Sequence, residues 1–162
     1  MPRVQAWLAR EFGGEAGDYR FERDARGRPL LQRAALDCSW SHSGEHLLVA
    51  CGEAARVGAD LEAIRPRANA LALARRFFAD DETAWLSQRA HLESDFLRLW
   101  CAKEAVLKAH GHGLAFGLHR LAFAETDGAL FLARCDAELG DPRDWRLREL
   151  APAPGTLAAL AW

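Results

Sequence analysis

Apolar residues recur every three or four positions in several segments of the chain, which predicts amphipathic helices. The first helix is expected over residues 3–12, where the apolar positions are Val4, Trp7, Leu8 and Phe12. Three further helices are expected in the middle of the chain, over residues 69–78, 80–89 and 94–110. The last is the strongest helix prediction, because Ser94 can cap its start and Gly111 can end it.

Other segments alternate between polar and apolar residues, as strands do. In residues 36–42, Leu36, Cys38, Trp40 and His42 would occupy one face, and Asp37, Ser39 and Ser41 the other. A turn at Ser43 and Gly44 leads to a strand over residues 46–53, and a second turn leads to one over residues 57–62. We therefore predict a three-stranded antiparallel meander. A second set of strands is expected over residues 118–125, 129–135, 144–150 and 155–162.

The order of these elements is helix, strands, helices, strands, which favours an α+β fold over one that alternates strand and helix. We expect a single domain over residues 1–162, built as a pseudo-dimer of two similar lobes. The lobes would span about residues 1–65 and 66–162. Each would be a small antiparallel sheet packed on helices.

Composition narrows the possible functions. The net charge of −2 argues against a general nucleic-acid binder, which usually carries a basic excess. No apolar run has the length needed to cross a bilayer, and the first residues lack the apolar core of a signal peptide. The sequence therefore predicts a cytoplasmic protein whose partners are neither nucleic acids nor membranes.

The cysteines are spaced without a C-x-x-C pair, at Cys38, Cys51, Cys101 and Cys135. In a cytosolic chain, this spacing favours reduced and mostly buried thiols over a disulfide or a zinc site.

Two carboxylates lie two residues apart in the short apolar segment "VGADLE", residues 57–62. On a strand, Asp60 and Glu62 share a face with Gly58, roughly 7 Å from each other along the chain. Either water screens their repulsion, or a cation lies between them.

A second polar pattern lies on the long helix. Trp100, Glu104 and Lys108 are spaced i, i+4, i+8, so they form one stripe. Alone, Glu104 and Lys108 could be an ordinary surface ion pair. With Asp60 and Glu62, Glu104 would complete three hard oxygen ligands of the kind that Mg²⁺ prefers, and Lys108 could neutralise a phosphate.

Two further segments carry groups suited to phosphate. The segment "SWSHSGE" supplies the hydrogen-bond donors Ser41, His42 and Ser43, although His42 could instead be packed under the sheet. The segment "GRP" places Arg28 in a rigid turn. Arginine suits phosphate recognition, but an arginine in a turn is usually only solvated.

Together these segments resemble the 4′-phosphopantetheinyl transferases. "VGADLE" and, about forty residues later, "WCAKEAVLK" resemble the paired family signature of a G-x-D-x-E strand and a W-x-x-K-E-x-x-x-K helix. "GRPLL" and "WSHSGEH" resemble the G-[KR]-P and S-H-S motifs of the larger, surfactin-synthetase-activating type. The four motifs occur in the family's order, and the similarity covers roughly residues 3–162.

The resemblance implies transfer of the phosphopantetheine arm of coenzyme A to a serine of an apo acyl or peptidyl carrier protein, with release of adenosine 3′,5′-bisphosphate. It implies that Glu104 helps to deprotonate the serine and that Lys108 stabilises charge on the departing phosphate. The implied Mg²⁺ ligands are Asp60, Glu62 and Glu104, and Asp60 and Lys108 join Glu104 as catalytic residues. The implied coenzyme A contacts are Arg28, Ser41, His42, Lys103 and Lys108.

The resemblance also implies where the carrier protein docks, near the long helix and the loop over residues 111–118. Leu114 and Phe116 are candidate contacts there. The alternative is that both are core residues, which is favoured more for Phe116 because large aromatic side chains are usually buried. Members of the larger type usually begin with an additional segment whose basic residues help to bind the nucleotide, and this chain starts at what resembles the helix that follows it. We therefore expect Arg3 or Arg10 to take the place of those basic residues, or nucleotide binding to be weaker. A monomer is expected, with a dimer as the alternative.

Two other functions remain open on the sequence. One is a catalytically weak module that binds coenzyme A or a carrier protein. The other is a Mg²⁺-dependent phosphohydrolase that acts on a nucleotide. Magnesium-dependent modification of a carrier protein would distinguish the transferase from both.

Overall fold

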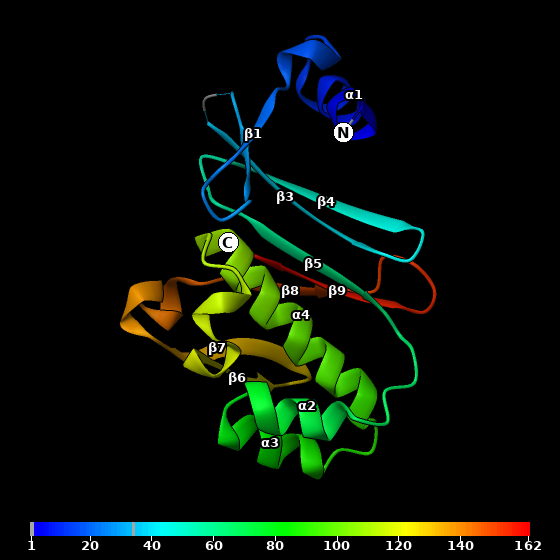
Figure 1. Cartoon of the computed structure of the whole chain (residues 1–162), viewed down its shortest axis with the longest axis vertical. Helices are drawn as coiled ribbons and strands as arrows, with labels where there is room; N and C mark the ends of the chain where they lie inside the picture. The colour runs from blue at the N-terminus through cyan, green and yellow to red at the C-terminus, as the bar shows by residue number, and fades with distance from the viewer. Residues whose placement is uncertain (1, 34) are drawn as a thin grey trace.

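The computed structural model describes residues 2–33 and 35–162 (Figure 1). Its α-helices are α1 (Pro2–Phe12), α2 (Ala70–Phe77), α3 (Asp80–Ser87) and α4 (Leu92–His110). The four predicted helices are therefore confirmed. The predicted start of the longest is wrong, because α4 begins two residues before Ser94 and His91 occupies its N-cap. Gly111 ends α4 with a left-handed backbone, φ 92°, as predicted.

The strands are short and antiparallel. They are β1 (Phe21–Arg23), β2 (Pro29–Leu31), β3 (Leu36–Ser43), β4 (His46–Glu53), β5 (Gly58–Ala63), β6 (Leu121–Thr126), β7 (Ala129–Cys135), β8 (Leu147–Leu150) and β9 (Thr156–Ala161). β1 pairs with β2, β3 with β4 and β6 with β7, while β5, β9 and β8 form a three-stranded sheet in that order. The predicted α+β class with small antiparallel sheets is confirmed.

Single turns of 3₁₀-helix occupy several of the connections between these elements. They are η1 (Ala16–Asp18), η2 (Leu114–Phe116), η3 (Leu118–Arg120), η4 (Ala137–Leu139) and η5 (Pro142–Asp144). None of the helices in residues 2–33 and 35–162 combines the length and the hydropathy needed to cross a bilayer.

The predicted meander is wrong in its third strand. β5 pairs with β9 near the C-terminus instead of with the β3–β4 hairpin. β3 still lies beside β5, but its side chains take the place of a backbone ladder (Figure 1). Three of them accept hydrogen bonds from backbone N–H groups of β5 and its entry: Asp37 from Val57 at 2.8 Å, Ser39 from Ala59 at 3.0 Å and Ser43 from Ala63 at 3.0 Å. We call this contact the β3–β5 seam.

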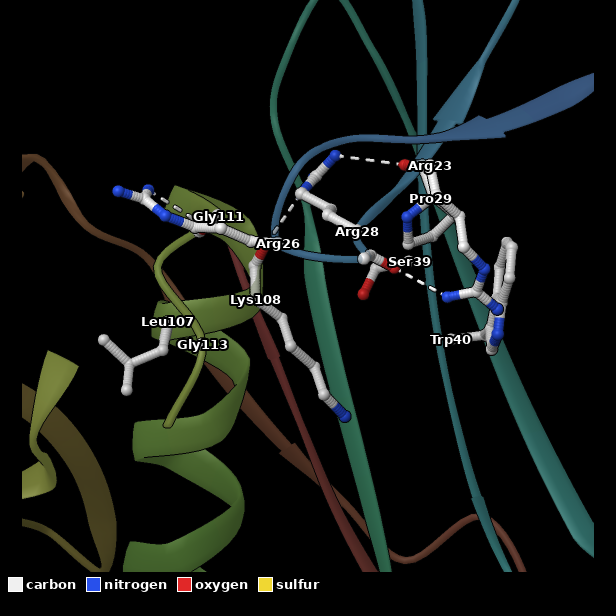
Figure 2. Close-up of a pocket in the computed structure, with 11 residues that line it drawn as sticks. Arg23, Arg26, Arg28, Pro29, Ser39, Trp40, Leu107, Lys108, Gly111 and Gly113 are labelled. Carbon is white, nitrogen blue, oxygen red and sulfur yellow. Dashed lines mark hydrogen bonds between the residues drawn. The ribbon is translucent and has the colours of Figure 1, made fainter. Parts of the chain in front are cut away.

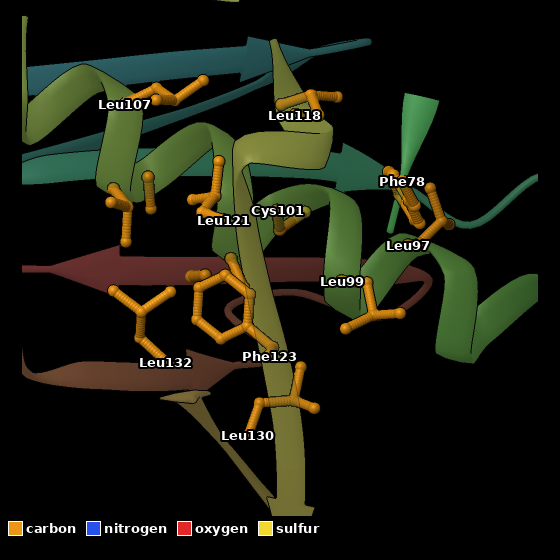
Figure 3. Close-up of a cluster of buried hydrophobic side chains, with 14 of the residues drawn as sticks. Phe78, Leu97, Leu99, Cys101, Leu107, Leu118, Leu121, Phe123, Leu130 and Leu132 are labelled. Carbon is orange, nitrogen blue, oxygen red and sulfur yellow. The ribbon is translucent and has the colours of Figure 1, made fainter. Parts of the chain in front are cut away.

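Two clusters of buried side chains make up the core. The larger surrounds α4 and includes Phe78, Leu97, Leu99, Leu107, Leu121, Phe123 and Leu132 (Figure 3). The smaller lies under α1 and consists of Val4, Leu8, Tyr19 and Cys38. The seam lies between these clusters, so β5 pairs with β9 of the second half of the chain and its backbone also donates hydrogen bonds to side chains of β3 in the first half.

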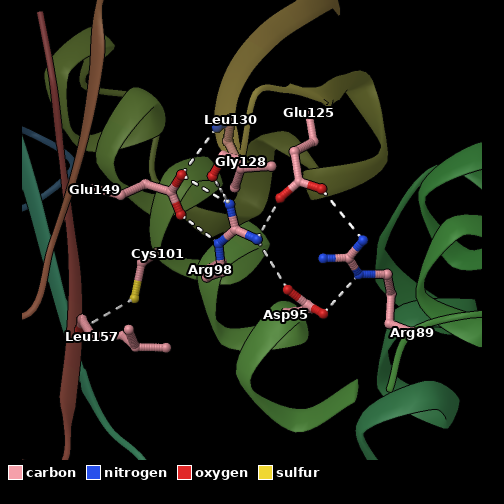
Figure 4. Close-up of polar contacts among 9 residues, drawn as sticks. All are labelled: Arg89, Asp95, Arg98, Cys101, Glu125, Gly128, Leu130, Glu149 and Leu157. Carbon is pink, nitrogen blue, oxygen red and sulfur yellow. Dashed lines mark hydrogen bonds and ion pairs between the residues drawn. The ribbon is translucent and has the colours of Figure 1, made fainter. Parts of the chain in front are cut away.

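A charged network around Arg98 joins α4 to β6 and β8 (Figure 4). The Arg98 guanidinium lies 3.0 Å from Asp95, 2.7 Å from Glu125 on β6 and 2.7 Å from Glu149 on β8. Bonds of this kind between charged groups are the stronger hydrogen bonds in proteins. The network therefore fixes the rotation of α4 and with it the stripe that carries Glu104.

Candidate active site

β5 and α4 touch backbone to backbone at Gly58. A Cβ at this position would lie 1.8 Å from the carbonyl oxygen of Ala105 and 2.6 Å from the nitrogen of Ala109, so only glycine fits. Asp60 and Glu62 are on the same face of the strand as Gly58. Both carboxylates therefore extend from β5 toward α4, which explains the spacing of the G-x-D-x-E segment.

Asp60 is the centre of a small polar cluster. Its side chain is buried, and its Oδ1 accepts hydrogen bonds from Lys108 Nζ at 2.7 Å and Ser41 Oγ at 2.9 Å. Lys108 Nζ also donates to the carbonyl oxygen of Ala59 at 3.1 Å. The structure thus brings together three of the predicted site residues, from β3, β5 and α4. The partner of Lys108 is Asp60, and not the Glu104 of a surface ion pair.

Glu104 lies beside this cluster and is 7% exposed. Burial, followed by the nearby charge of Asp60, raises the pKa of Glu104 to about 7, although Lys108 opposes the shift. Glu104 Oε1 and Asp60 Oδ2 are buried without a hydrogen-bond partner among the described residues. Two unpartnered carboxylate oxygens on facing elements fit a hard divalent cation, which takes oxygen ligands.

Glu62 is placed differently from the other two carboxylates. It is half-buried, and its Oε2 forms an ion pair with Arg67 at 3.1 Å. Burial and the charge of Asp60 raise the pKa of Glu62. Within the part of the chain that the structure describes, no three acidic, histidine or cysteine side chains form a ready-made metal site. The predicted set of three ligands is therefore not assembled, because Glu62 faces Arg67.

A basic cavity of about 230 Å³ adjoins the cluster (Figure 2). It lies between the β1–β2 turn, β3 and the C-terminal end of α4, and its lining includes Arg23, Arg26, Arg28, Ser39, Trp40 and Lys108. Figure 2 shows Arg23 and Trp40 on one side of the cavity and Arg26 on the other. Several cationic side chains around one hollow favour an anionic ligand.

Arg28 is held in place by several protein partners. Its guanidinium binds Asp37 through two nitrogens, at 2.8 and 2.6 Å, and donates to the carbonyl oxygens of Lys108 at 2.8 Å and Val57 at 3.1 Å. A further contact to the carbonyl oxygen of Pro29 at 3.4 Å engages the remaining donor. Arg28 thus ties the β1–β2 turn to β3, β5 and α4. Arg28 also lines the cavity, and its predicted contact with the nucleotide stays a prediction.

Arg23 and Arg26 are the cavity residues that sequence reasoning missed. Each spends one donor on a nearby carbonyl oxygen, of Gly27 for Arg23 and, at a longer 3.4 Å, of Gly111 for Arg26. The available signal was the repetition of arginine in the turn "RDARGRP". Spacing alone could not tell which arginine was the structural one.

Lys103 also departs from the prediction. Its side chain is fully buried on the far side of α4 and forms an ion pair with Glu82 at 2.7 Å. Its ammonium group donates to the carbonyl oxygens of Leu118 and Leu121. Burial lowers the pKa of Lys103. The predicted contact between Lys103 and a phosphate is wrong, because the residue is one helical step off the Glu104 stripe.

The remaining predicted contacts lie on the surface. His42 is exposed, on the face of β3 opposite Ser41, so the alternative of a histidine packed under the sheet is wrong. Its contact with a phosphate stays a prediction. Leu114 is 55% exposed, whereas Phe116 is half-buried and stacked on His112.

Comparison with known proteins identifies the class to which this site belongs. The family model described as "4'-phosphopantetheinyl transferase superfamily" matches residues 56–160, which hold Asp60, Glu104 and Lys108. The chain therefore belongs to the 4′-phosphopantetheinyl transferase superfamily.

Relatives in several bacteria agree. The chain is 34% identical over 164 residues to the 4′-phosphopantetheinyl transferase HetI of Nostoc, covering 98% of this chain and 66% of HetI. It is 40% identical over 122 residues to the transferase psf-1 of Bacillus pumilus, covering 73% of this chain and 51% of psf-1. The chain thus spans between about half and two thirds of the length of these relatives.

Solved structures share the fold. The holo-[acyl-carrier-protein] synthases of Thermotoga maritima and Neisseria meningitidis both superpose with a TM-score of 0.53, at 21% and 19% sequence identity. Both cover 65% of this chain, with 60% of the Thermotoga chain and 94% of the Neisseria chain aligned.

Proposed function

We propose that this protein transfers the 4′-phosphopantetheine group of coenzyme A to a serine of an apo carrier protein and releases adenosine 3′,5′-bisphosphate. The observation that carries the proposal is the pair of unpartnered, buried oxygens on Asp60 and Glu104, beside Lys108 and next to a basic cavity. Family membership and the shared fold support the same reaction.

The diphosphate of coenzyme A would lie beside Asp60 and Glu104, and the nucleotide end in the basic cavity. Arg23 and Arg26 would bind the phosphate on the ribose, with Trp40 along the cavity wall. Arginine forms paired hydrogen bonds with phosphate, which would orient the nucleotide. Lys108 would leave Asp60 in part and stabilise charge on the departing phosphate.

Asp60 and Glu104 are the residues that would hold Mg²⁺, with Glu62 as a third ligand once it is released from Arg67. A bound Mg²⁺ would neutralise charge on the diphosphate and polarise the phosphorus under attack. Asp60 Oδ2 and Glu104 Oε1 support this assignment, because neither buried oxygen receives a hydrogen bond from residues 2–33 or 35–162.

Glu104 would accept the proton of the carrier serine as its oxygen attacks phosphorus, directly or through a water molecule. A general base works best when its pKa lies near the working pH, and the pKa of Glu104 is raised to about 7. The bond that breaks is the one between the attacked phosphorus and the oxygen that leaves with adenosine 3′,5′-bisphosphate. We expect the carrier to approach from the side of η2, where Leu114 is exposed.

Intact mass spectrometry of an apo acyl carrier protein tests the proposal. We expect a mass gain equal to one phosphopantetheine when the protein, coenzyme A and Mg²⁺ are all present. Glu104→Gln should abolish the gain, whereas Glu45→Gln, at an exposed carboxylate in the β3–β4 turn, should not.

The alternative function is a module that binds coenzyme A or a carrier protein with little turnover. It predicts calorimetric binding of coenzyme A with no mass gain on apo acyl or peptidyl carriers. That result, with the wild-type protein folded, would overturn the transferase proposal. Release of adenosine 3′,5′-bisphosphate without a carrier would instead indicate a phosphohydrolase.

A further inference from the structure

Two cysteines face each other across the β3–β4 hairpin, on the face opposite the seam. In the register of the hairpin, Cys38 is directly opposite Cys51. Both are free thiols. Neither cysteine lies in the motif segments, and no part of the proposed reaction uses them.

The hairpin places this pair at the closer of the two spacings found in antiparallel sheets. The backbone N–H of Ala54 donates to Ala35 at 2.7 Å, so positions 35 and 54 form a hydrogen-bonded pair. Such pairs alternate along an antiparallel ladder, which makes Cys38 and Cys51 a non-hydrogen-bonded pair. In those pairs the Cα atoms lie about 4.5 Å apart and the side chains are close. This separation is within the range that a disulfide spans.

The two thiols differ in access. Cys38 is 0% exposed and packs with Val4, Leu8 and Tyr19 under α1. Cys51 packs on the edge of the same cluster and is partly exposed. The hydrogen bond between the two thiols raises the pKa of Cys38, with burial adding to the shift, and lowers the pKa of Cys51. Cys51 is therefore the more accessible sulfur, with Cys38 opposite it in the hairpin.

The other thiols lack such a partner. Cys101 is buried, and its Sγ lies 3.7 Å from the carbonyl oxygen of Leu157. Cys135 is partly exposed and sits opposite Leu121 in the β6–β7 pair. Cys135 thus provides a control thiol of similar exposure that has no cysteine across the strand.

We propose that Cys38 and Cys51 are a redox-modification site that forms a reversible cross-strand disulfide by exchange with a small-molecule disulfide such as oxidised glutathione. The Cys51 thiolate attacks one sulfur of the small disulfide, whose S–S bond breaks and releases one thiolate. The Cys38 thiol then loses its proton and attacks the Cys51 sulfur, which displaces the second small thiolate. Two electrons pass to the small disulfide, and two protons end on the two small thiols.

The disulfide would fix the strand that carries the seam. Asp37 and Ser39 flank Cys38 and point to the other face, where they bind the backbone of β5. A bond between Cys38 and Cys51 closes the hairpin as a loop and so restricts the unfolded chain. Oxidation would therefore stabilise the hairpin without a change in register, because the two cysteines are already paired.

Intact mass spectrometry of the folded protein after incubation with oxidised glutathione tests the site. We expect the wild-type mass to fall by two hydrogens and to be restored by dithiothreitol. Peptide mapping should join the peptide that contains Cys38 to the one that contains Cys51. Cys38→Ser should stop the exchange at one glutathione on Cys51, and Cys135→Ser should still lose two hydrogens.

The contrary results are equally specific. A wild-type protein that carries glutathione on Cys51 and forms no internal disulfide would overturn the proposal. So would a disulfide that joins either residue to Cys101 or Cys135. If Cys38→Ser fails to fold, the peptide map of the oxidised wild-type protein decides between these outcomes by itself.

Discussion

The ammonium group of Lys108 on α4 lies 2.7 Å from Asp60 Oδ1 on β5, so the lysine pairs with a carboxylate of another element and not with Glu104, which precedes it by one helical turn. The Asp60 side chain is 7% exposed, and its Oδ1 contacts the ammonium group of Lys108 and the hydroxyl of Ser41. Removing one partner of a buried ion pair leaves the other charge uncompensated. Lys108 is thus a partner of Asp60 in the structure, and in the proposed reaction it would also bind a phosphate.

Lys108→Met tests whether Lys108 acts in the reaction or is only an ordinary surface cation. We expect carrier modification to fall by about a hundred- to a thousand-fold, the range typical of the loss of one group that stabilises transition-state charge. Lys108→Arg keeps the charge and should retain more activity than Lys108→Met. Initial rates of holo-carrier formation at saturating coenzyme A provide the measurement, and equal rates for the two variants would contradict the assignment.

Gly58→Ala tests the close contact between β5 and α4. The new Cβ would lie 1.8 Å from the Ala105 carbonyl oxygen, so the strand or the helix must shift. We expect a loss of about 1–3 kcal/mol in the free energy of unfolding, as for other overpacked sites. Urea unfolding measures it. Gly17→Ala is the matched control, because a Cβ at Gly17 meets nothing within 4 Å. A loss as large in the control would contradict the packing argument.

Periodicity in the sequence predicts the direction of side chains but not their distant partners. The motif segments predicted the family and brought Asp60, Glu104 and Lys108 to one site, since strand and helix periodicity fix which residues share a face. Periodicity could not show that β5 pairs with β9, because an antiparallel partner distant in sequence leaves no local signal. Similarly, Arg28 matched a phosphate-binding pattern but forms an ion pair with Asp37. Only the folded structure shows that these two residues are neighbours.

Lys103→Met distinguishes a structural lysine from a phosphate ligand. Glu82 would lose its partner in a site where both side chains are almost fully buried. We expect a loss of about 3–5 kcal/mol in the free energy of unfolding, the range for breaking a buried ion pair. Calorimetric affinity for coenzyme A should change little in whatever fraction remains folded.

A double variant provides the control for Lys103. Glu82 also accepts hydrogen bonds from the backbone N–H groups of Phe123, through Oε1, and Ala79, through Oε2. Glu82→Gln removes the charge and keeps one acceptor oxygen for these two donors. Lys103→Met with Glu82→Gln should recover part of the lost stability. Additive losses in a double-mutant cycle would show that the two side chains do not interact.

Glu104 makes stability depend on pH in metal-free buffer. The pKa of Glu104 is raised from 4.5 to about 7, so the folded protein holds this proton more tightly than the unfolded chain does. Stability from this group is fully present below pH 4.5 and is lost as pH rises through about 7, a change of about 3 kcal/mol. Urea unfolding across this range should show the slope. Glu104→Gln should remove it, and an unchanged slope would contradict the shifted pKa.

Arg26 and Arg28 should behave differently although both line the basic cavity. Arg26→Ala removes a cation that is free to bind phosphate, so we expect weaker binding of adenosine 3′,5′-bisphosphate, by about ten-fold, with little effect on folding. Arg28→Met breaks the buried ion pair with Asp37, so its main effect should be a lower free energy of unfolding. Isothermal titration at two salt concentrations measures the affinity, and thermal unfolding measures the stability.

Arg148→Ala, at an exposed arginine on β8, is the control and should change neither the affinity nor the stability. An Arg26→Ala protein with unchanged affinity would place the nucleotide outside this cavity.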